Sequence, residues 1–188
     1  AGPDTLVICD PAMADNGVYY SGFDDGMTEA FRRLCARADV ITPNVTEAAL
    51  LSGAEFRPAP HSRGYIDRLF DGLERHAGRF IAITGVHPAE GVIGTVVRDR
   101  QTGEERSAMS AALPGMFYGT GDIFASAFSA LLVRGASVGD ALDAAAGLVR
   151  ESIERCYERG APRPYGVDFE GALPDYVRRV QEIFGGKA

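Results

Sequence analysis

The sequence predicts an α/β fold with a largely parallel sheet flanked by helices and a β-hairpin that makes the sheet mixed. Short apolar runs alternate with amphipathic segments of helical length along the first 85 residues, and this rhythm is typical of right-handed βαβ units. Two alternating segments separated by turn residues follow, and the last third is almost entirely of helical period. We therefore expect a parallel sheet covered by helices on both faces, with an antiparallel addition.

The first half of the chain supplies the expected parallel strands and the helices between them. The three apolar runs that we expect as strands are residues 6–9, 40–43 and 80–85. The segments of helical spacing are residues 24–38, 46–51 and 65–73. Asp24 and Asp25 are candidate caps for the first helix, Gly53 ends the second, and the two prolines within 56–62 predict a loop.

The second half begins with the hairpin and is otherwise helical. Residues 91–98 and 104–110 alternate in polarity around the turn at 99–103. Helices are expected over residues 120–134, 138–157 and 169–184. Since there is no repeat, low-complexity tract or linker, we expect residues 1–188 to form one domain.

Composition excludes several classes of protein. The chain is 46% hydrophobic and 24% charged, as in ordinary globular proteins. Its net charge is −7 and Lys187 is its only lysine, which disfavours nucleic-acid binding. No apolar run is long enough for a bilayer, and the first residues lack the features of a signal peptide, which predicts a cytoplasmic protein.

Cysteine and histidine show no metal-binding or disulfide pattern. The three cysteines include no C-x-x-C pair, and the three histidines lie far apart. We therefore expect no zinc site and no disulfide framework. The cysteines are expected to be small, partly buried apolar residues in a reducing compartment.

The strongest local signal is Gly119-Thr120-Gly121-Asp122, directly before an apolar helix. Two glycines allow the backbone to approach a ligand closely, and a helix start presents unpaired N–H groups with partial positive charge. This predicts an anion site. From these four residues alone, Asp122 could equally be a helix cap.

A second group of polar residues follows the expected strands. Open α/β sheets bind ligands at the carboxyl ends of their strands, and polar residues stand at all three ends: Asp10 and Asp15, then Thr42, Asn44 and Glu47, then Thr84 and Gly85. Each alone is more typical of a cap or turn. Together at one sheet edge they indicate a site.

Four segments in this order and spacing resemble the pyridoxal kinase family of the ribokinase-like superfamily. Members carry D-P-V-M-x-D, P-N-x-x-E-A-x-x-L, a strand ending in T-G or T-S, and G-T-G-D. The corresponding segments here are residues 10–17, 40–51, 83–85 and 119–122. The tail Tyr165-Gly166-Val167-Asp168-Phe169-Glu170 is similar to the end of bacterial pyridoxamine kinases, so the resemblance covers essentially the whole chain.

The resemblance implies ATP-dependent phosphorylation of the 5′-hydroxymethyl group of a vitamin B6 compound. It makes Asp122 the catalytic base, and the N–H groups of Gly119, Thr120 and Gly121, with that of Asp122, the donors to the transferred phosphoryl group. No G-x-x-x-x-G-K-[ST] loop is present or needed.

The resemblance also implies the sites of the nucleotide and the metals. Asp15 and Glu47 match positions near Mg²⁺, directly or through water. Residues that match positions around the phosphates, the nucleotide or a monovalent cation (K⁺ or Na⁺) are Asp10, Thr42, Asn44, Thr84, Gly85 and Thr120.

The chain departs from the family at three points. Ala12 replaces a usual valine, which we interpret as a packing change, and Tyr118 stands where histidine is frequent. Members also begin with a further N-terminal stretch that supplies the first strand, much of the pyridine pocket and the dimerisation strands. We therefore expect an N-terminally incomplete kinase, a homodimer in full-length form, with an uncovered sheet edge here.

Three alternatives remain open. A hydroxymethylpyrimidine or hydroxymethylpyrimidine-phosphate kinase of thiamin synthesis shares the fold and the G-T-G-D type of motif, and sugar kinases of the superfamily are a weaker rival. From another class, the polypeptide could be a nucleotide-binding module without catalysis.

Overall fold

The computed structural model describes residues 5–159 and 166–185. The chain consists of two compact units, Ala1–Met109 and Ser110–Ala188. Lys187 and Tyr165, which entered the sequence argument, lie outside the described residues. The single-domain expectation for residues 1–188 stays a prediction.

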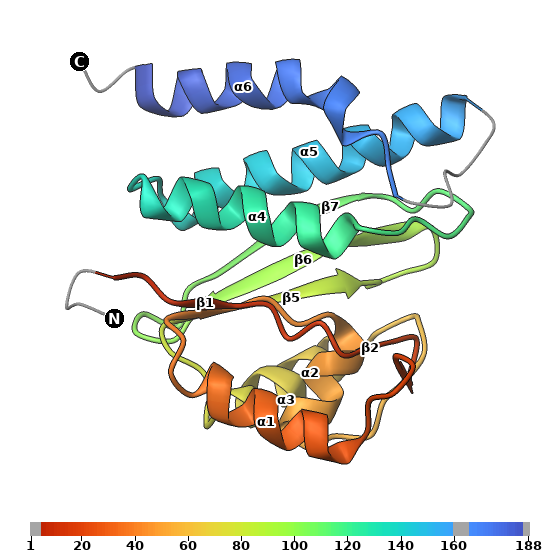
Figure 1. Ribbon diagram of the computed structural model, residues 1–188, viewed down its shortest axis with the longest axis vertical. Helices are drawn as coiled ribbons and strands as arrows, with labels where there is room; N and C mark the ends of the chain where they lie inside the picture. Colours follow the sequence, from red (N-terminus) through yellow and green to blue (C-terminus); the bar gives the residue numbers. More distant parts are fainter. Residues whose placement is uncertain (1–4, 160–165, 186–188) are drawn as a thin grey trace. The chain divides into compact units, whose positions relative to one another are not determined.

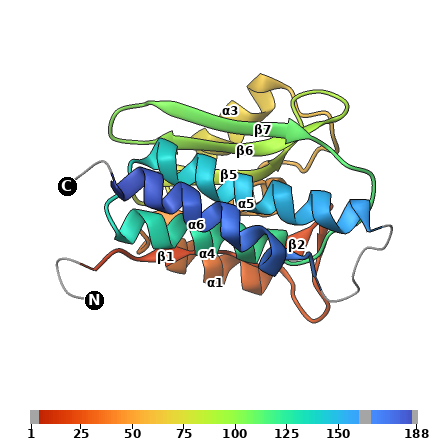
Figure 2. The same ribbon diagram turned by 90° about the horizontal axis from the view of Figure 1, so that it is seen from above.

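A five-stranded mixed sheet forms the centre of the first unit (Figure 2). The strands are β1 (Ile8–Cys9), β4 (Val40–Ile41), β5 (Phe80–Val86), β6 (Val92–Asp99) and β7 (Glu105–Ala111), in the order β1-β4-β5-β6-β7. The first three are parallel, and β5 pairs with β6 antiparallel. The predicted parallel strands and the antiparallel addition are therefore confirmed.

Three helices lie on one side of this sheet (Figure 1). They are α1 (Asp25–Cys35), α2 (Val45–Ser52) and α3 (Arg63–Leu73). The expected cap of α1 and the expected C-terminal glycine of α2 are confirmed: Asp24 accepts the N–H of Gly26 at 2.9 Å, and Gly53 adopts the left-handed conformation with φ 77°. In contrast, α1 ends at Cys35, three residues before the expected position.

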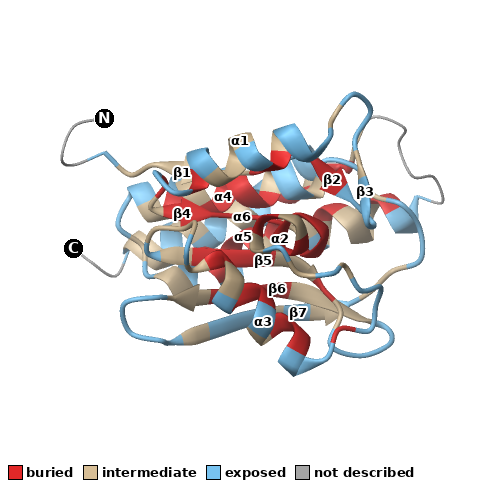
Figure 3. Cartoon of the chain, turned by 90° about the horizontal axis from the view of Figure 1, so that it is seen from below, coloured by how far each residue is buried: buried red, intermediate tan, exposed pale blue. Residues whose placement is uncertain are grey.

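The hydrophobic core of this unit lies between the sheet and its helices. Its fully buried side chains include Met13, Ile41, Leu51, Tyr65, Leu69, Phe70, Ile81 and Ile83. The helix α2 is buried around most of its circumference, whereas α1 keeps an exposed face (Figure 3). A short helix with so little exposed surface is held by packing, and its start is fixed in place.

A short hairpin that the sequence analysis did not predict lies between β1 and α1. Its strands, β2 (Ala14–Asp15) and β3 (Val18–Tyr19), are antiparallel. The two loop residues, Asn16 and Gly17, both have positive φ, 51° and 79°. This is the geometry of a type I′ turn, for which Asn-Gly is the preferred sequence.

The second unit consists mainly of three helices, α4 (Thr120–Val133), α5 (Val138–Glu158) and α6 (Phe169–Gly185). All three begin and end within one residue of the expected positions. The hydroxyl of Tyr176 donates to the carbonyl of Ala127 at 3.3 Å, which joins α6 to α4. The guanidinium of Arg179 donates to the carbonyl of Asp143 at 3.0 Å, which joins α6 to α5.

The cysteines and the length of the helices can also be compared with the sequence-based expectations. Cys9 is half-buried, Cys35 and Cys156 are buried, and all three are free thiols, as predicted. No helix among the described residues is long and apolar enough to cross a membrane.

Candidate functional site

The start of α2 is closed by a reciprocal capping box. The side chain of Asn44 accepts the N–H of Glu47 at 2.9 Å, and the carboxylate of Glu47 accepts the N–H of Asn44 at 2.9 Å. The spacing Asn-x-x-Glu is a sequence signature of this cap. Both residues, predicted as ligands of metal or phosphate, therefore also hold the helix start.

Glu47 joins this helix start to the hairpin. Its second oxygen accepts the N–H groups of Met13 at 3.0 Å and Ala14 at 3.4 Å, and the amide of Asn44 donates to the carbonyl of Ala14 at 2.8 Å. Only 3% of Glu47 is exposed. Burial raises its pKa to about 7, although the three N–H donors act in the opposite direction.

Asp10 and Asp15 differ in their surroundings. Asp10, directly after β1, accepts the hydroxyl of Thr42 at 2.9 Å, and Thr42 is buried. Asp15 is exposed at the end of β2, where its carboxylate accepts the backbone N–H and the side-chain amide of Asn16 at 2.8 and 3.0 Å. Asp15 is thus the more accessible of the two carboxylates.

A β-bulge places Thr84 and Gly85. The β5–β6 register shifts between Ile83 and Val86, and Gly85 has φ 69°. Thr84 donates its N–H to the carbonyl of Pro43 at 2.9 Å and forms a parallel bridge with Asn44. Bulges redirect the chain and are frequent beside active sites, and here the bulge brings the end of β5 to the start of α2.

The first unit thus joins the strand-end residues in two hydrogen-bonded sets. Its hydrogen bonds link Asn44 with Glu47, both with the hairpin, and Asp10 with Thr42. One contributor was missed: the hydroxyl of Thr46 accepts the N–H of Gly17 at 3.0 Å and ties the turn to α2. The Asn-Gly pair was the signal that could have predicted this hairpin. Ala12 is exposed, so its change from valine is not a change in core packing.

The second unit contains the glycine-lined helix start. Gly119 is the N-cap of α4 with φ 79°, and no side chain caps the helix. The first internal bond runs from the N–H of Ile123 to the carbonyl of Gly119 at 3.1 Å. A β-carbon added at Gly119 or Gly121 would have no atom of the described chain within 4 Å. The start of α4 thus has no side-chain cap and has room for a close ligand at both glycines, two features that an anion site requires.

Asp122 is the third residue of α4 and is exposed. Because Gly119 is the N-cap and receives no help from a side chain, the alternative that Asp122 caps this helix is wrong. Asp122 lies in the second unit and the acidic strand ends lie in the first. That they face one ligand stays a prediction.

The residues of the first unit fit a hydrated magnesium ion better than a closed protein cage. Within the described part of the chain, no three histidine, cysteine or acidic side chains are arranged to hold a metal. Mg²⁺ keeps several waters and takes one or two carboxylates together with substrate phosphates. The exposed carboxylate of Asp15 suits direct contact, whereas Glu47, whose oxygens already accept three N–H groups, suits contact through water.

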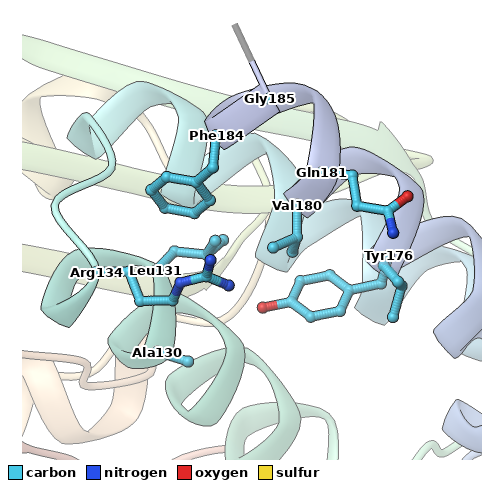
Figure 4. A pocket seen from close by; sticks show the side chains of 9 residues that line it. Ala130, Leu131, Arg134, Tyr176, Val180, Gln181, Phe184 and Gly185 are labelled. Carbon is cyan, nitrogen blue, oxygen red and sulfur yellow. The ribbon is translucent and has the colours of Figure 1, made fainter. Parts of the chain in front are cut away.

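A pocket of about 680 Å³ lies in the second unit between α4 and α6 (Figure 4). The guanidinium of Arg134 stands 4.3 Å from the centre of the Phe184 ring on its wall. Arg134 is the C-cap of α4, whereas Gly119 is its N-cap. The pocket therefore belongs to the opposite end of the helix from the glycine motif.

Comparison with known proteins agrees with the resemblance. The sequence profile of the phosphomethylpyrimidine kinase family matches residues 3–164. A pyridoxal kinase from Granulibacter bethesdensis is 28% identical over 165 residues, which cover 86% of this chain and 57% of that protein. The structure of pyridoxal kinase from Lactobacillus plantarum matches with a TM-score of 0.79 at 30% identity, over 95% of this chain and 63% of that one. A protein of Bacteroides thetaiotaomicron assigned as a phosphomethylpyrimidine kinase, in a crystal form with pyridoxal, matches with a TM-score of 0.85 at 28% identity, over 94% of this chain and 62% of that one.

The chain spans 50–57% of the length of the curated relatives that it matches. The profile nevertheless covers most of the chain itself. The expected resemblance to pyridoxal kinases and the α/β fold are confirmed, and the chain belongs to the phosphomethylpyrimidine kinase family.

Proposed function

We propose that this chain carries the phosphoryl-transfer part of an ATP-dependent kinase that phosphorylates the 5′-hydroxymethyl group of pyridoxal, pyridoxamine or pyridoxine. The observation that carries the proposal is the open, uncapped start of α4 with an exposed carboxylate in its first turn. Phosphoryl transfer needs this combination of N–H donors and a base beside an alcohol. The similarity to proteins named pyridoxal kinases supports the choice of substrate.

In this proposal the residues of α4 perform the chemistry. Asp122 accepts the proton of the substrate hydroxyl as the hydroxyl oxygen attacks the γ-phosphorus of ATP. The bond between the γ-phosphorus and the β-phosphate oxygen breaks, and ADP leaves. The N–H groups of Gly119, Thr120, Gly121 and Asp122 donate to the oxygens of the transferred group, where negative charge is concentrated. A β-carbon at residue 121 would occupy the space that the phosphoryl group needs.

The first unit supplies the metal and phosphate ligands in the same proposal. Asp15 binds Mg²⁺ directly and Glu47 binds it through water, while Asp10, Thr42 and Thr84 surround a monovalent cation and the phosphates. Asn44 uses its remaining N–H and lone pair on the phosphates or their metal, and Gly85 leaves room for the nucleotide. Mg²⁺ held by these residues would neutralise the negative charge of the phosphates. A homodimer is a further prediction from the resemblance, and a cytoplasmic location also stays a prediction.

The test of the base is Asp122→Asn in the intact protein. Turnover should fall by about 10²- to 10⁴-fold because the amide cannot take a proton, while the Kd for ATP and the melting temperature stay near their original values. Asp140→Asn is a matched control, since Asp140 is also the third residue of its helix, α5. Near-normal turnover in Asp122→Asn would remove this residue from the role of base.

A second candidate is phosphorylation of hydroxymethylpyrimidine or its phosphate, which the matching family profile favours by its name. A coupled assay for ADP release should compare these pyrimidines with pyridoxal, pyridoxamine and pyridoxine. We expect the largest kcat/KM with a B6 compound, and preference for a pyrimidine would replace the proposal with this alternative. Calorimetric binding of ATP with Mg²⁺ but no turnover on any alcohol would instead indicate a nucleotide-binding module.

A further inference from the structure

Asp168 anchors the segment that enters α6. It is 5% exposed, and its carboxylate faces the guanidinium of Arg159 at 2.5 Å and that of Arg155 at 3.8 Å. Its own N–H contacts the sulfur of Cys156 at 3.1 Å. These three partners belong to the last turns and C-cap of α5. One buried carboxylate therefore fixes this segment, which includes the buried Val167, to the end of α5.

The first turn of α6 is shaped around the same ion pair. A β-carbon at Gly171 would overlap the guanidinium of Arg155, so the guanidinium packs directly against the backbone of this turn and would have to move if residue 171 had a side chain. Ala172, the next residue, is fully buried. The C-terminal end of α5 and the beginning of α6 are thus joined at Asp168 with little freedom to shift.

The anchored segment reaches the glycine motif through Gly166. This residue has φ 126°, and a β-carbon placed on it would lie 3.6 Å from the carbonyl oxygen of Tyr118, in ordinary contact. Tyr118 directly precedes the N-cap Gly119. Figure 1 shows the short coil that leads into α6.

Several observations among the described residues show that side chains hold the start of α4 only weakly. The side chain of Tyr118 is 55% exposed, no side chain caps α4, and both glycines of the motif face open space. The hydroxyl of Thr120 reaches the carbonyl of Phe117 only at 3.5 Å. We therefore infer that the orientation of the N–H groups of α4 depends on the packing of Gly166 beside the backbone of Tyr118.

We propose that Asp168 is a positioning residue for phosphoryl transfer: its ion pairs with Arg155 and Arg159 hold Gly166 against Tyr118 and so fix the N–H groups at the start of α4. This rests on the proposed function of that helix start. The carboxylate of Asp168 is buried whereas both arginines are partly exposed, and we assign these ion pairs a role in conformational specificity rather than in net stability. Small displacements of donors, even from distant changes, reduce turnover by up to about 10²-fold.

The test compares Asp168→Asn with Asp175→Asn, which changes an exposed acid paired with Arg178 on the same helix. Amide hydrogen exchange is the first readout. Asp168→Asn should speed exchange at Ile123, the first hydrogen-bonded N–H of α4, by about tenfold, while the middle of α4 exchanges as before. A uniform increase across α4 to α6, or no change at Ile123, would overturn the proposal.

Kinetics in the intact protein are the second readout. Asp168→Asn should lower kcat by about 10- to 100-fold with the KM for ATP within about twofold, because the donors act mainly on the transition state. Asp168→Glu, which keeps the charge, should recover part of kcat and of the exchange protection. An equal loss in kcat and rise in KM without recovery contradicts positioning.

Two outcomes separate this proposal from the function on which it rests. If the protein phosphorylates no alcohol, the proposed function fails, while exchange at Ile123 still decides whether Asp168 supports α4. Should Asp168→Asn not fold, Arg159→Gln replaces it, because Arg159 is 55% exposed and its loss leaves Arg155 in place. This variant should raise exchange at Ile123 in the same local pattern by a smaller factor, and unchanged exchange there overturns the proposal.

Discussion

The two groups of residues assigned to the site differ in how far the protein satisfies their polar atoms. In the first unit, Glu47, Asn44 and Thr42 are buried or half-buried and bonded to backbone or side chains. At the start of α4 in the second unit, the N–H groups have no side-chain partner and Asp122 is exposed. The polar atoms of the first group are mostly bonded within the protein, whereas those of the second group remain available to a ligand.

The motifs in the sequence therefore contain two kinds of residue, those that stabilise the fold and those that are open to a ligand. A polar atom bonded within the protein contributes to folding, so its loss leaves buried partners unsatisfied. An atom left open contributes to folding little and to a bound anion much. Substitutions in the first group should therefore lower stability, whereas those in the second should lower turnover without a loss of stability.

The largest effect on stability is expected for Glu47→Ala. It removes the acceptor of three N–H groups, at Met13, Ala14 and Asn44, and should lower the free energy of unfolding by about 2–4 kcal/mol. Denaturant titration measures it. The control is Glu29→Ala, which removes an exposed i,i+3 pair with Arg32 and should cost no more than about 0.5 kcal/mol. If both variants lost the same free energy of unfolding, the proposed structural role of Glu47 would be contradicted.

The clearest difference between an effect on turnover and an effect on stability is expected for Gly121→Ala. Its β-carbon meets no protein atom, and alanine is a better helix residue than glycine by up to about 1 kcal/mol, so stability should stay equal or rise. Turnover should nevertheless fall by about 10- to 100-fold because the methyl group enters the space of the phosphoryl group.

Gly139→Ala is the matched control for this change. Gly139 is the second residue of α5, as Gly121 is of α4, and its β-carbon would meet only the hydroxyl of Ser137 at 3.9 Å. Stability should respond in the same way in both variants and turnover only in Gly121→Ala. Full turnover in Gly121→Ala would show that no ligand approaches the start of α4 closely.

A smaller loss of stability is expected for Thr42→Val. The change keeps the shape of a buried side chain but removes the donor to Asp10, and should cost about 1–2 kcal/mol in thermal unfolding. Thr95→Val is the control, since Thr95 is also buried but has no side-chain hydrogen bond among the described residues. A loss in Thr95→Val as large as in Thr42→Val would speak against the importance of the Asp10 bond.

The smallest effect is a pH dependence at His61, outside both groups. Its Nδ1 accepts the N–H of His87 at 3.0 Å, and burial, with His87 as a lesser cause, lowers the pKa of His61 below 6.5. A lowered pKa in the folded state gives stability that is present above pH 6.5 and is lost as the pH falls through the folded value. His61→Gln should therefore lose less stability than the original protein between pH 7.5 and 5.5, and an identical loss would contradict this role.

Most of the fold could be predicted from local patterns. Helices α4, α5 and α6 matched to within one residue because long apolar periodicity and caps agree over many turns. Hairpin β2–β3 was missed because its two-residue strands carry no periodicity. The Asn16-Gly17 signal was present, but it was interpreted only as part of a longer motif.

The site could be predicted in its residues but not in its bonds. The motifs named Asn44 and Glu47. However, the double role of Glu47 as cap and hairpin anchor requires Met13 and Ala14, which lie 34 and 33 positions away in sequence, to come within hydrogen-bond distance. Likewise, the bulge at Thr84 arises from pairing with β6. Tertiary contacts of this kind cannot be predicted from short stretches of neighbouring residues.

The turn at Gly17 has a consequence for how this family can vary. A side chain there would need an unfavourable φ of 79° and would collide with the ring of Phe56. Replacement is therefore tolerable only in lineages that first acquire a smaller neighbour at position 56. Aligned homologues should accordingly show positions 17 and 56 changing together, with the glycine lost last.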